Sequence, residues 1–199
     1  MKILVVGASG VIGSAIVNAL SGEHQVISAS RSSGDVTVDL SNPASIRAMF
    51  SQIDQVDAII SAAGEADVKP LEALTDQDYD RASGMQLMGQ INLFRYGKDS
   101  LAPGGSVTLT SGVASKYNFP GAAAIGMDCA GLERFADAAA QELTDIRLNV
   151  VSPTSVTESM EKLGWPTEGS ITAANTAKSY LAAVTGTMTG QTLNTAEYA

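Results

Sequence analysis

A short apolar run that breaks into a glycine-rich turn constrains the fold of this chain more than any other feature. Residues 3–6 have the β-branched, apolar composition of a strand buried on both faces of a parallel sheet. The turn Gly7-Ala8-Ser9-Gly10-Val11-Ile12-Gly13 follows, and apolar residues then recur at helical spacing to residue 20. A strand, a glycine turn and a helix in this order can bind a dinucleotide, because the phosphates meet free N–H groups at the helix N-terminus. The alternative is a plain structural turn.

Length, charge and residue usage narrow the remaining classes. The 199 residues suffice for one domain with a substantial core. No apolar stretch is as long as a membrane span, and the first residues resemble a strand rather than a signal peptide. The net charge of −9 argues against nucleic acid or an anionic membrane as a partner. His24 and Cys129 are single, so we expect a cytoplasmic protein with neither a His/Cys metal cluster nor an internal disulfide.

Strand and helix patterns alternate along the rest of the chain. Strands are predicted at residues 25–29, 35–40, 56–61, 106–110 and 147–151, with an edge strand at 192–194. Helices are predicted at about 43–53, 75–100, 121–143 and 172–184, and the stretch after Pro153 shows no regular pattern. The alternation predicts a Rossmann-like, doubly wound α/β fold, with about seven parallel strands in the order 3-2-1-4-5-6-7 and helices on both faces. Residues 1–199 are expected to form a single domain that binds its ligands at the carboxyl ends of the strands.

The segment after the second predicted strand bears on the choice of dinucleotide. Proteins that select NAD usually place Asp or Glu there, about 20 residues after the glycines, to bind the ribose 2′-hydroxyl. This chain has Ser28-Ala29-Ser30-Arg31-Ser32-Ser33 and no acidic residue. Arg31 could pair with a 2′-phosphate, and Ser32 and Ser33 could donate hydrogen bonds to it. We therefore expect NADP(H) in preference to NAD(H), the alternative being a solvated arginine in a polar turn.

Further segments resemble the short-chain dehydrogenase/reductase family over nearly the whole chain. The glycine loop has the spacing of the extended and atypical branches of the family. Asp39-Leu40 resembles the contact to the adenine ring, and Ser61-Ala62-Ala63-Gly64 resembles the Asn-Asn-Ala-Gly segment beside the adenosine ribose. Residues 149–153, ending in Pro153, resemble the segment before the Pro-Gly turn over the nicotinamide, although Thr154 replaces that glycine. The resemblance implies a cofactor site formed by Gly7, Ser9, Gly10, Val11, Ile12, Arg31, Ser32, Ser33, Asp39, Leu40, Ser61, Ala62, Ala63, Gly64 and Pro153.

The catalytic residues of the family are the part that this chain does not repeat. The resemblance implies a serine at the end of the fifth strand and a Tyr-x-x-x-Lys pair on the next helix, whose tyrosine protonates the carbonyl oxygen. Counting from Ser111 puts Ala124 and Asp128 at the two positions, whereas an alignment anchored further along the helix puts Ile125 and Cys129 there. Neither alignment restores the pair. The chain is therefore expected to be a small, divergent member with a non-standard catalytic centre.

Few residues remain as candidates for the chemistry. Ser111 is the strongest candidate for substrate contact, the alternative being a structural role at the end of a strand. Tyr117 is a weaker candidate proton donor, because a solvent-facing tyrosine is the simpler interpretation. Asp128 could be a general acid if burial raised its pKa, the alternative being a cap or an ion pair at the surface. Gln86 stands where the family has an asparagine that supports a water relay.

Three functions are compatible with the sequence. The first is an NADP(H)-dependent oxidoreductase acting on a small carbonyl or enone. The second is a dinucleotide-binding protein without redox activity, such as a sensor or a partner subunit, and the third is an isomerase or cyclase on the same fold. The resemblance also implies a homodimer or homotetramer, formed through the helices after the fourth and fifth strands.

Overall fold

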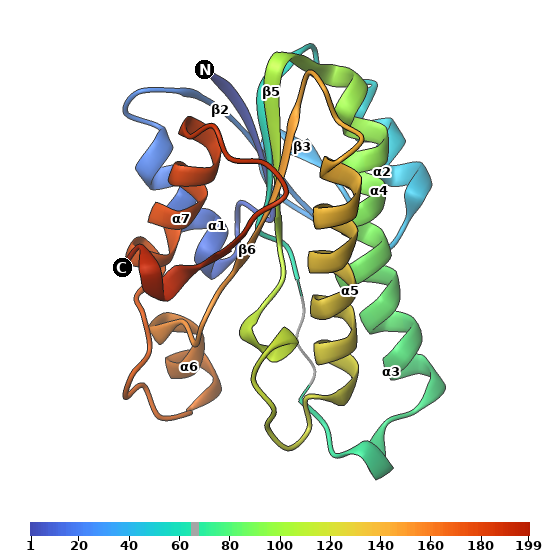
Figure 1. Ribbon diagram of the computed structural model, residues 1–199, viewed down its shortest axis with the longest axis vertical. Coiled ribbons are helices and arrows are strands. Elements are labelled where there is room, and N and C mark those ends of the chain that lie inside the picture. Colours follow the sequence, from blue (N-terminus) through green and yellow to red (C-terminus); the bar gives the residue numbers. More distant parts are fainter. Residues whose placement is uncertain (65–67) are drawn as a thin grey trace.

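A single sheet of seven parallel strands organises the computed structural model, which describes residues 1–64 and 68–199 (Figure 1). The strand order is β3-β2-β1-β4-β5-β6-β7, so the predicted Rossmann-like α/β topology is confirmed. The strands are β1 (Lys2–Val6), β2 (Gln25–Ser30), β3 (Val36–Thr37), β4 (Val56–Ser61), β5 (Leu101–Thr110), β6 (Arg147–Ser152) and β7 (Thr192–Asn194). The α-helices are α1 (Val11–Leu20), α2 (Pro43–Phe50), α3 (Asp76–Arg81), α4 (Gln90–Gly97), α5 (Ala123–Ala140), α6 (Thr157–Leu163) and α7 (Ala173–Thr185).

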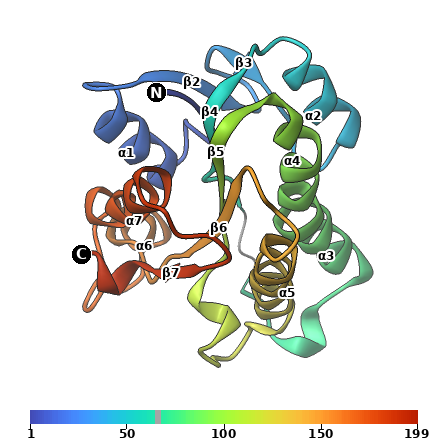
Figure 2. The ribbon, with the colours of Figure 1, turned by 45° about the horizontal axis from the view of Figure 1, so that its top comes forward.

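Helices cover the sheet on both faces, with α1, α6 and α7 on one side and α2, α3, α4 and α5 on the other (Figure 2). The two layers follow from the alternation of side chains along each strand. In β1, Leu4 and Val6 pack toward α2, α4 and α5, whereas Ile3 and Val5 pack toward α1 and α7. Strands β1, β4 and β6 each contribute to two separate hydrophobic clusters, whereas β5 contributes to the first alone. No helix in the described ranges has the length and apolar character needed to span a membrane.

Four segments differ from the sequence prediction, among them β5, which begins at Leu101 and not at residue 106. The third strand contains only Val36–Thr37, because Asp39 Oδ1 accepts hydrogen bonds from the backbone N–H and the hydroxyl of Ser41 and turns the chain toward α2. The long helix predicted at 75–100 contains a π-helical segment, Ala82–Gly89, between α3 and α4. Residues 157–163 form α6, where no regular structure was predicted. Both helical differences lie next to the candidate site described below, as is frequent for π-helical turns.

Side chains from both helical layers hold the carboxyl end of β5. Thr110 Oγ1 donates to the carbonyl oxygen of Ser61 over 2.5 Å, and the Tyr180 hydroxyl of α7 lies 2.6 Å from the same Oγ1. Because Thr110 has one hydroxyl hydrogen, Tyr180 is the donor of the second bond. On the opposite face, Gln90 Nε2 donates to the Thr110 carbonyl oxygen over 2.6 Å, and Gln90 Oε1 accepts from its N–H over 2.8 Å. The end of this central strand is thereby fixed in position.

Replacing Tyr180 with phenylalanine tests the strength of this arrangement. Tyr180 is fully buried, and burial raises the pKa of its phenol well above the ordinary value, so the hydroxyl remains a donor. Tyr180→Phe removes one buried hydrogen bond and is expected to lower the free energy of unfolding by about 1 kcal/mol. The melting temperature should fall by about 2–4 °C. Urea unfolding followed by circular dichroism measures the change, and Tyr117→Phe, at a side chain 62% exposed, should leave stability unchanged.

Candidate functional site

The glycine turn between β1 and α1 packs more closely than any side chain would permit. Gly7 has a φ of +84°, and a Cβ on it would lie 2.7 Å from backbone atoms of Ala62 and Ala63. A Cβ on Gly13 would lie only 2.0 Å from the carbonyl oxygen of Gly7. The N-cap of α1 is Gly10, which makes no side-chain capping hydrogen bond. The first-turn N–H groups therefore face the carboxyl edge of the sheet without a side-chain cap, which suits an anionic ligand.

A first cavity of about 170 Å³ lies beside this turn, at the ends of β1, β2 and β4. It brings together most of the cofactor residues predicted in the first half of the chain. Five residues predicted in this half of the chain lie outside its lining, namely Val11, Ile12, Ser32, Ser33 and Ser61. Ser33 instead hydrogen-bonds to Ser30 through backbone and side chain. The predicted residues that line the cavity are Gly7, Ser9, Gly10, Arg31, Asp39, Leu40, Ala62, Ala63 and Gly64.

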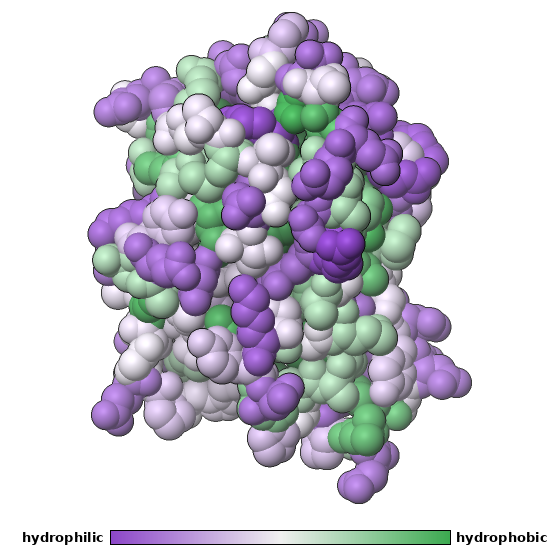
Figure 3. All heavy atoms as spheres, in the orientation of Figure 1, coloured by the Kyte–Doolittle hydropathy of each residue, from purple (hydrophilic) through white to green (hydrophobic). Residues whose placement is uncertain are grey.

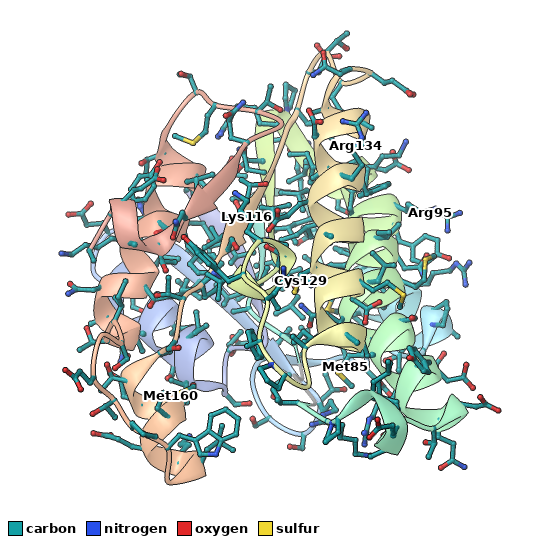
Figure 4. The ribbon with its side chains drawn as sticks, turned by 60° about the horizontal axis from the view of Figure 1, so that its bottom comes forward. Met85, Arg95, Lys116, Cys129, Arg134 and Met160 are labelled. Atoms are coloured by element: carbon teal, nitrogen blue, oxygen red, sulfur yellow. The ribbon has the colours of Figure 1, made fainter. Side chains whose placement is uncertain are left out.

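A second cavity of about 500 Å³ continues from the first along the ends of β4, β5 and β6. The two cavities share Ala62 and Gly64, so together they form one cleft across the carboxyl edge of the sheet. The second cavity contains the predicted cofactor residues Ile12 and Pro153 and the predicted catalytic residue Ser111. Figure 4 shows Met85 of the π-helical segment and Met160 of α6, which line the first and second cavity, on opposite sides of this edge.

The hydroxyl of Ser111 is directed at helix α5. Its Oγ lies 2.7 Å from Glu133 Oε1, and the hydroxyl of Ser115 lies 2.8 Å from the same oxygen. A serine hydroxyl has a single hydrogen, so in this arrangement Ser111 can only accept a hydrogen bond from a ligand. Glu133 thus anchors both ends of the loop 111–115, which forms one wall of the second cavity.

Helix α5 presents Ile125 to the second cavity, whereas Ala124 is buried and outside the lining. Cys129, one turn further, is fully buried, and a Cβ on Gly112 would lie 3.5 Å from its sulfur. This geometry favours the alignment that puts Ile125 and Cys129 at the tyrosine and lysine positions. Burial, with smaller contributions from the charges of Glu133 and Asp128, raises the pKa of the Cys129 thiol to about 12. The thiol is therefore neutral at physiological pH and supplies no charge that could replace a lysine.

The other two candidates for proton transfer lie outside both cavities. Tyr117 is 62% exposed and is absent from the cavity lining. Asp128 is fully buried between α5 and the π-helical segment, where Ser83 donates to its Oδ1 over 3.2 Å. Its Oδ2 has no hydrogen-bond partner among the described residues. The structure thus brings Ser111 to the cleft but not Tyr117 or Asp128.

The sequence identifies Gln86 as a candidate residue but does not predict its contacts. Its side chain is 4% exposed and lines the second cavity, and its Nε2 donates to the Thr110 carbonyl oxygen over 3.1 Å. A Cβ on Gly64 would lie 2.3 Å from Gln86 Oε1, so any side chain there would displace the Gln86 amide. The resemblance to the family identified Gln86 through its asparagine position. It did not predict that Gly64 and Gln86 would pack against each other.

Several apolar side chains of the second cavity were not predicted as a group. They come from the loop before α5 and from α6 and the turn after it, where the sequence shows neither a motif nor a clear period. These residues are Val113, Phe119, Val156, Met160, Leu163 and Trp165. The described residues contain no group of His, Cys, Asp and Glu side chains that could hold a metal ion.

The buried Asp128 carboxyl makes stability depend on pH. Desolvation raises its pKa above the ordinary value, so the folded state keeps the proton at pH values where the unfolded chain loses it. The carboxyl therefore favours the folded state below its unfolded pKa of about 4, and this advantage is lost as the pH rises through the folded pKa. Asp128→Asn cannot ionise, so its melting temperature should exceed that of the native sequence by a few degrees near neutral pH.

The comparison requires melting curves at several pH values. The advantage of Asp128→Asn should shrink toward about pH 4, the range in which the carboxyl is protonated in both states. Asp80→Asn, at an exposed position of α3, is the control. A constant difference at every pH would contradict the assignment of a buried, protonatable carboxyl.

The strand order and the cleft at the carboxyl edge define a dinucleotide-binding Rossmann fold. A family model described as Enoyl-(Acyl carrier protein) reductase matches residues 8–190. The chain therefore belongs to the short-chain dehydrogenase/reductase family, as its motifs indicated.

Solved structures with the same fold cover nearly the whole chain. The protein lin1944 from Listeria innocua is 42% identical, with a TM-score of 0.93 and 98% of each chain covered. A small-chain dehydrogenase in complex with NADPH is 25% identical, with a TM-score of 0.86 over 98% of this chain and 95% of that one.

Two relatives with named activities match in part. Hydroxynaphthalene reductase arp2 of Aspergillus fumigatus is 27% identical over 117 residues, which are 58% of this chain and 43% of that protein. The 2,3-dihydro-2,3-dihydroxybenzoate dehydrogenase of Escherichia coli is 26% identical over 121 residues, 59% of this chain and 49% of that protein. The chain thus spans about half the length of these relatives.

Proposed function

We propose that this protein is an NADP(H)-dependent oxidoreductase that reduces a small carbonyl or enone at a non-standard catalytic centre. The observation that carries the proposal is the continuous cleft from the glycine turn to the end of β6. Membership in a family of reductases and dehydrogenases supports the reaction class. The NADPH that accompanies a structural neighbour supports the cofactor.

The residues at the adenosine end of the cleft fit a phosphorylated dinucleotide. Gly7 and Gly13 let the turn pack closely against Ala62, Ala63 and the start of α1. The uncapped N-terminus of α1 is a suitable place for a pyrophosphate. Arg31 lines the first cavity at the end of β2. The nearest acidic residue in the chain, Asp35, accepts hydrogen bonds from the backbone and hydroxyl of Ser28, both over 2.8 Å. That carboxylate is thus engaged with Ser28 of β2. We assign the contact to a 2′-phosphate to Arg31, because this residue lines the first cavity.

The described residues at the substrate end of the cleft can orient a substrate, but they offer no acidic side chain to protonate it. A bound NADPH supplies the hydride there. Ile125 occupies the tyrosine position of the family in the alignment that the geometry favours, and none of the described lining residues of the second cavity has a titratable side chain. We therefore assign orientation of the substrate oxygen to Gln86 and to the hydroxyl groups of the lining, with the proton taken from water. Ser111 contributes as a hydrogen-bond acceptor and as part of the cavity wall.

A dinucleotide-binding protein without redox activity is the second candidate function. The same absence of a titratable group among the described lining residues favours it. The two functions share the cofactor site and differ in turnover. A protein that binds NADPH but never oxidises it with any ketone or enone would belong to the second class. The predicted homo-oligomer and cytoplasmic location stay predictions.

Titration of the purified protein with NADPH and NADH tests the cofactor assignment. NADPH is expected to bind in the micromolar range, with enhanced nicotinamide fluorescence and a raised melting temperature. Arg31→Ala should weaken NADPH binding by about tenfold to a hundredfold, the range for loss of a hydrogen bond to a charged group, and should leave NADH binding nearly unchanged. Arg134→Ala, on the solvent side of α5, is the matched control. Failure of both nucleotides to bind would refute the proposed function.

The alanine-rich helix α5 bears on the predicted oligomer. Its alanines are divided between core and surface, with Ala136 and Ala140 buried and Ala138 exposed. Figure 3 shows a weakly apolar surface, interrupted by hydrophilic residues, over the part of the molecule where α5 lies. Only some of the alanines of this helix are therefore accessible to a partner subunit.

A further inference from the structure

We propose that the second cavity selects neutral, ring-bearing ketones or enones over anionic ones, and that Phe119 and Trp165 determine this specificity. The inference rests on the proposed function, because it names the substrate class of the same cleft. It is carried by the charge of the lining and by two exposed aromatic side chains that border one cavity.

The described lining residues of the second cavity carry no charge. Among its described residues there is no Lys, Arg, Asp or Glu, and the polar groups are hydroxyls and the amide of Gln86. The chain as a whole has 12 Lys and Arg against 21 Asp and Glu. A carboxylate or phosphate on the substrate would lose water inside the cavity and find no cation among these residues. A neutral substrate avoids that cost.

The apolar side chains of the lining remain open to solvent in this structure. Phe119 is 41% exposed, Leu163 57% and Trp165 47%, and all three border the second cavity. Phe119 lies in the loop before α5, whereas Leu163 and Trp165 lie at the end of α6 and just after it. Figure 1 shows these two segments side by side at the lower end of the molecule. Exposed apolar side chains that gather around one cavity are typical of a ligand site, since the ligand removes them from water.

Two aromatic residues on different segments favour a ring as the occupant. Aromatic side chains pack well against flat apolar groups, in stacked or edge-to-face geometry. The few polar groups deeper in the cavity, chiefly Gln86, suffice to orient one carbonyl oxygen. A ligand with one oxygen and a flat hydrocarbon body therefore matches the lining at both ends, and tetralone and cyclohexenone are suitable probes.

Turnover of matched ketones tests the charge selection. NADPH oxidation is measured with tetralone and cyclohexenone and with their ring-carboxylated analogues. The neutral compounds should have kcat/KM values at least about tenfold higher, a difference of about 1.4 kcal/mol. Equal or better turnover of the carboxylates would overturn the proposal.

Variants of the aromatic residues test the second half of the proposal. Phe119→Ala and Trp165→Ala should raise KM for tetralone about tenfold while the Kd of NADPH stays unchanged, and Phe119→Tyr and Trp165→Phe should restore the native KM. Tyr79→Ala is the matched control, because Tyr79 is an aromatic side chain 37% exposed that lines neither cavity of the cleft. Both aromatic side chains are far from full burial, so the variants should fold normally. An unchanged KM in the alanine variants would overturn the assignment.

Fluorescence separates failure of this inference from failure of the proposed function. Trp165 is the only tryptophan of the chain, so its emission reports directly on the second cavity. Tetralone added to the protein with NADP⁺ should quench or shift this emission saturably, and the carboxylated analogue should not at the same concentration. Saturable quenching without any NADPH oxidation would support the binding inference and refute the redox function. Turnover without a change in emission would refute the inference alone.

Discussion

Buried hydrogen bonds at the end of β5 hold together the parts of the molecule on which the cleft depends. Thr110 is bound by Tyr180 from one helical layer and by Gln90 from the other, and its hydroxyl reaches across to β4. The next residue, Ser111, begins the loop that Glu133 anchors to α5. Because buried polar networks are costly when incomplete, this junction favours a single arrangement of strand and loop. The cavity wall is therefore as well defined as the core behind it.

Periodicity predicted the central elements well, because burial alone determines them. The strand at 56–61 has the predicted bounds, since its apolar residues are buried between two helical layers. The third strand was predicted too long because the Asp39 side chain forms local hydrogen bonds that compete with strand pairing. Helix α6 was missed because none of its residues is buried, so no apolar period marks it. Segments at the edge of the fold thus have a weaker hydrophobic periodicity than segments of the core, and they are harder to predict from the sequence.

The two ends of the cleft were predictable to different degrees. The glycine turn is a local signal, and its neighbours in the sequence line the first cavity. The substrate end is assembled from residues far apart in the chain, and a shift of one residue along α5 decides whether Ala124 or Ile125 faces it. Sequence spacing cannot set that rotation, because it depends on how the helix packs against the loop 111–115. The pairing of Gly64 with Gln86 likewise appears only in three dimensions.

The missing cap of α1 has a consequence for the cofactor site. Helices usually bind their first N–H groups with a side chain, but Gly10 has none, so this helix begins with unfilled donors. A dinucleotide phosphate would complete the helix in place of a residue of the chain. The phosphate would accept hydrogen bonds from the N–H groups of the first turn of α1. Nucleotide binding is therefore expected to stabilise this turn of the helix.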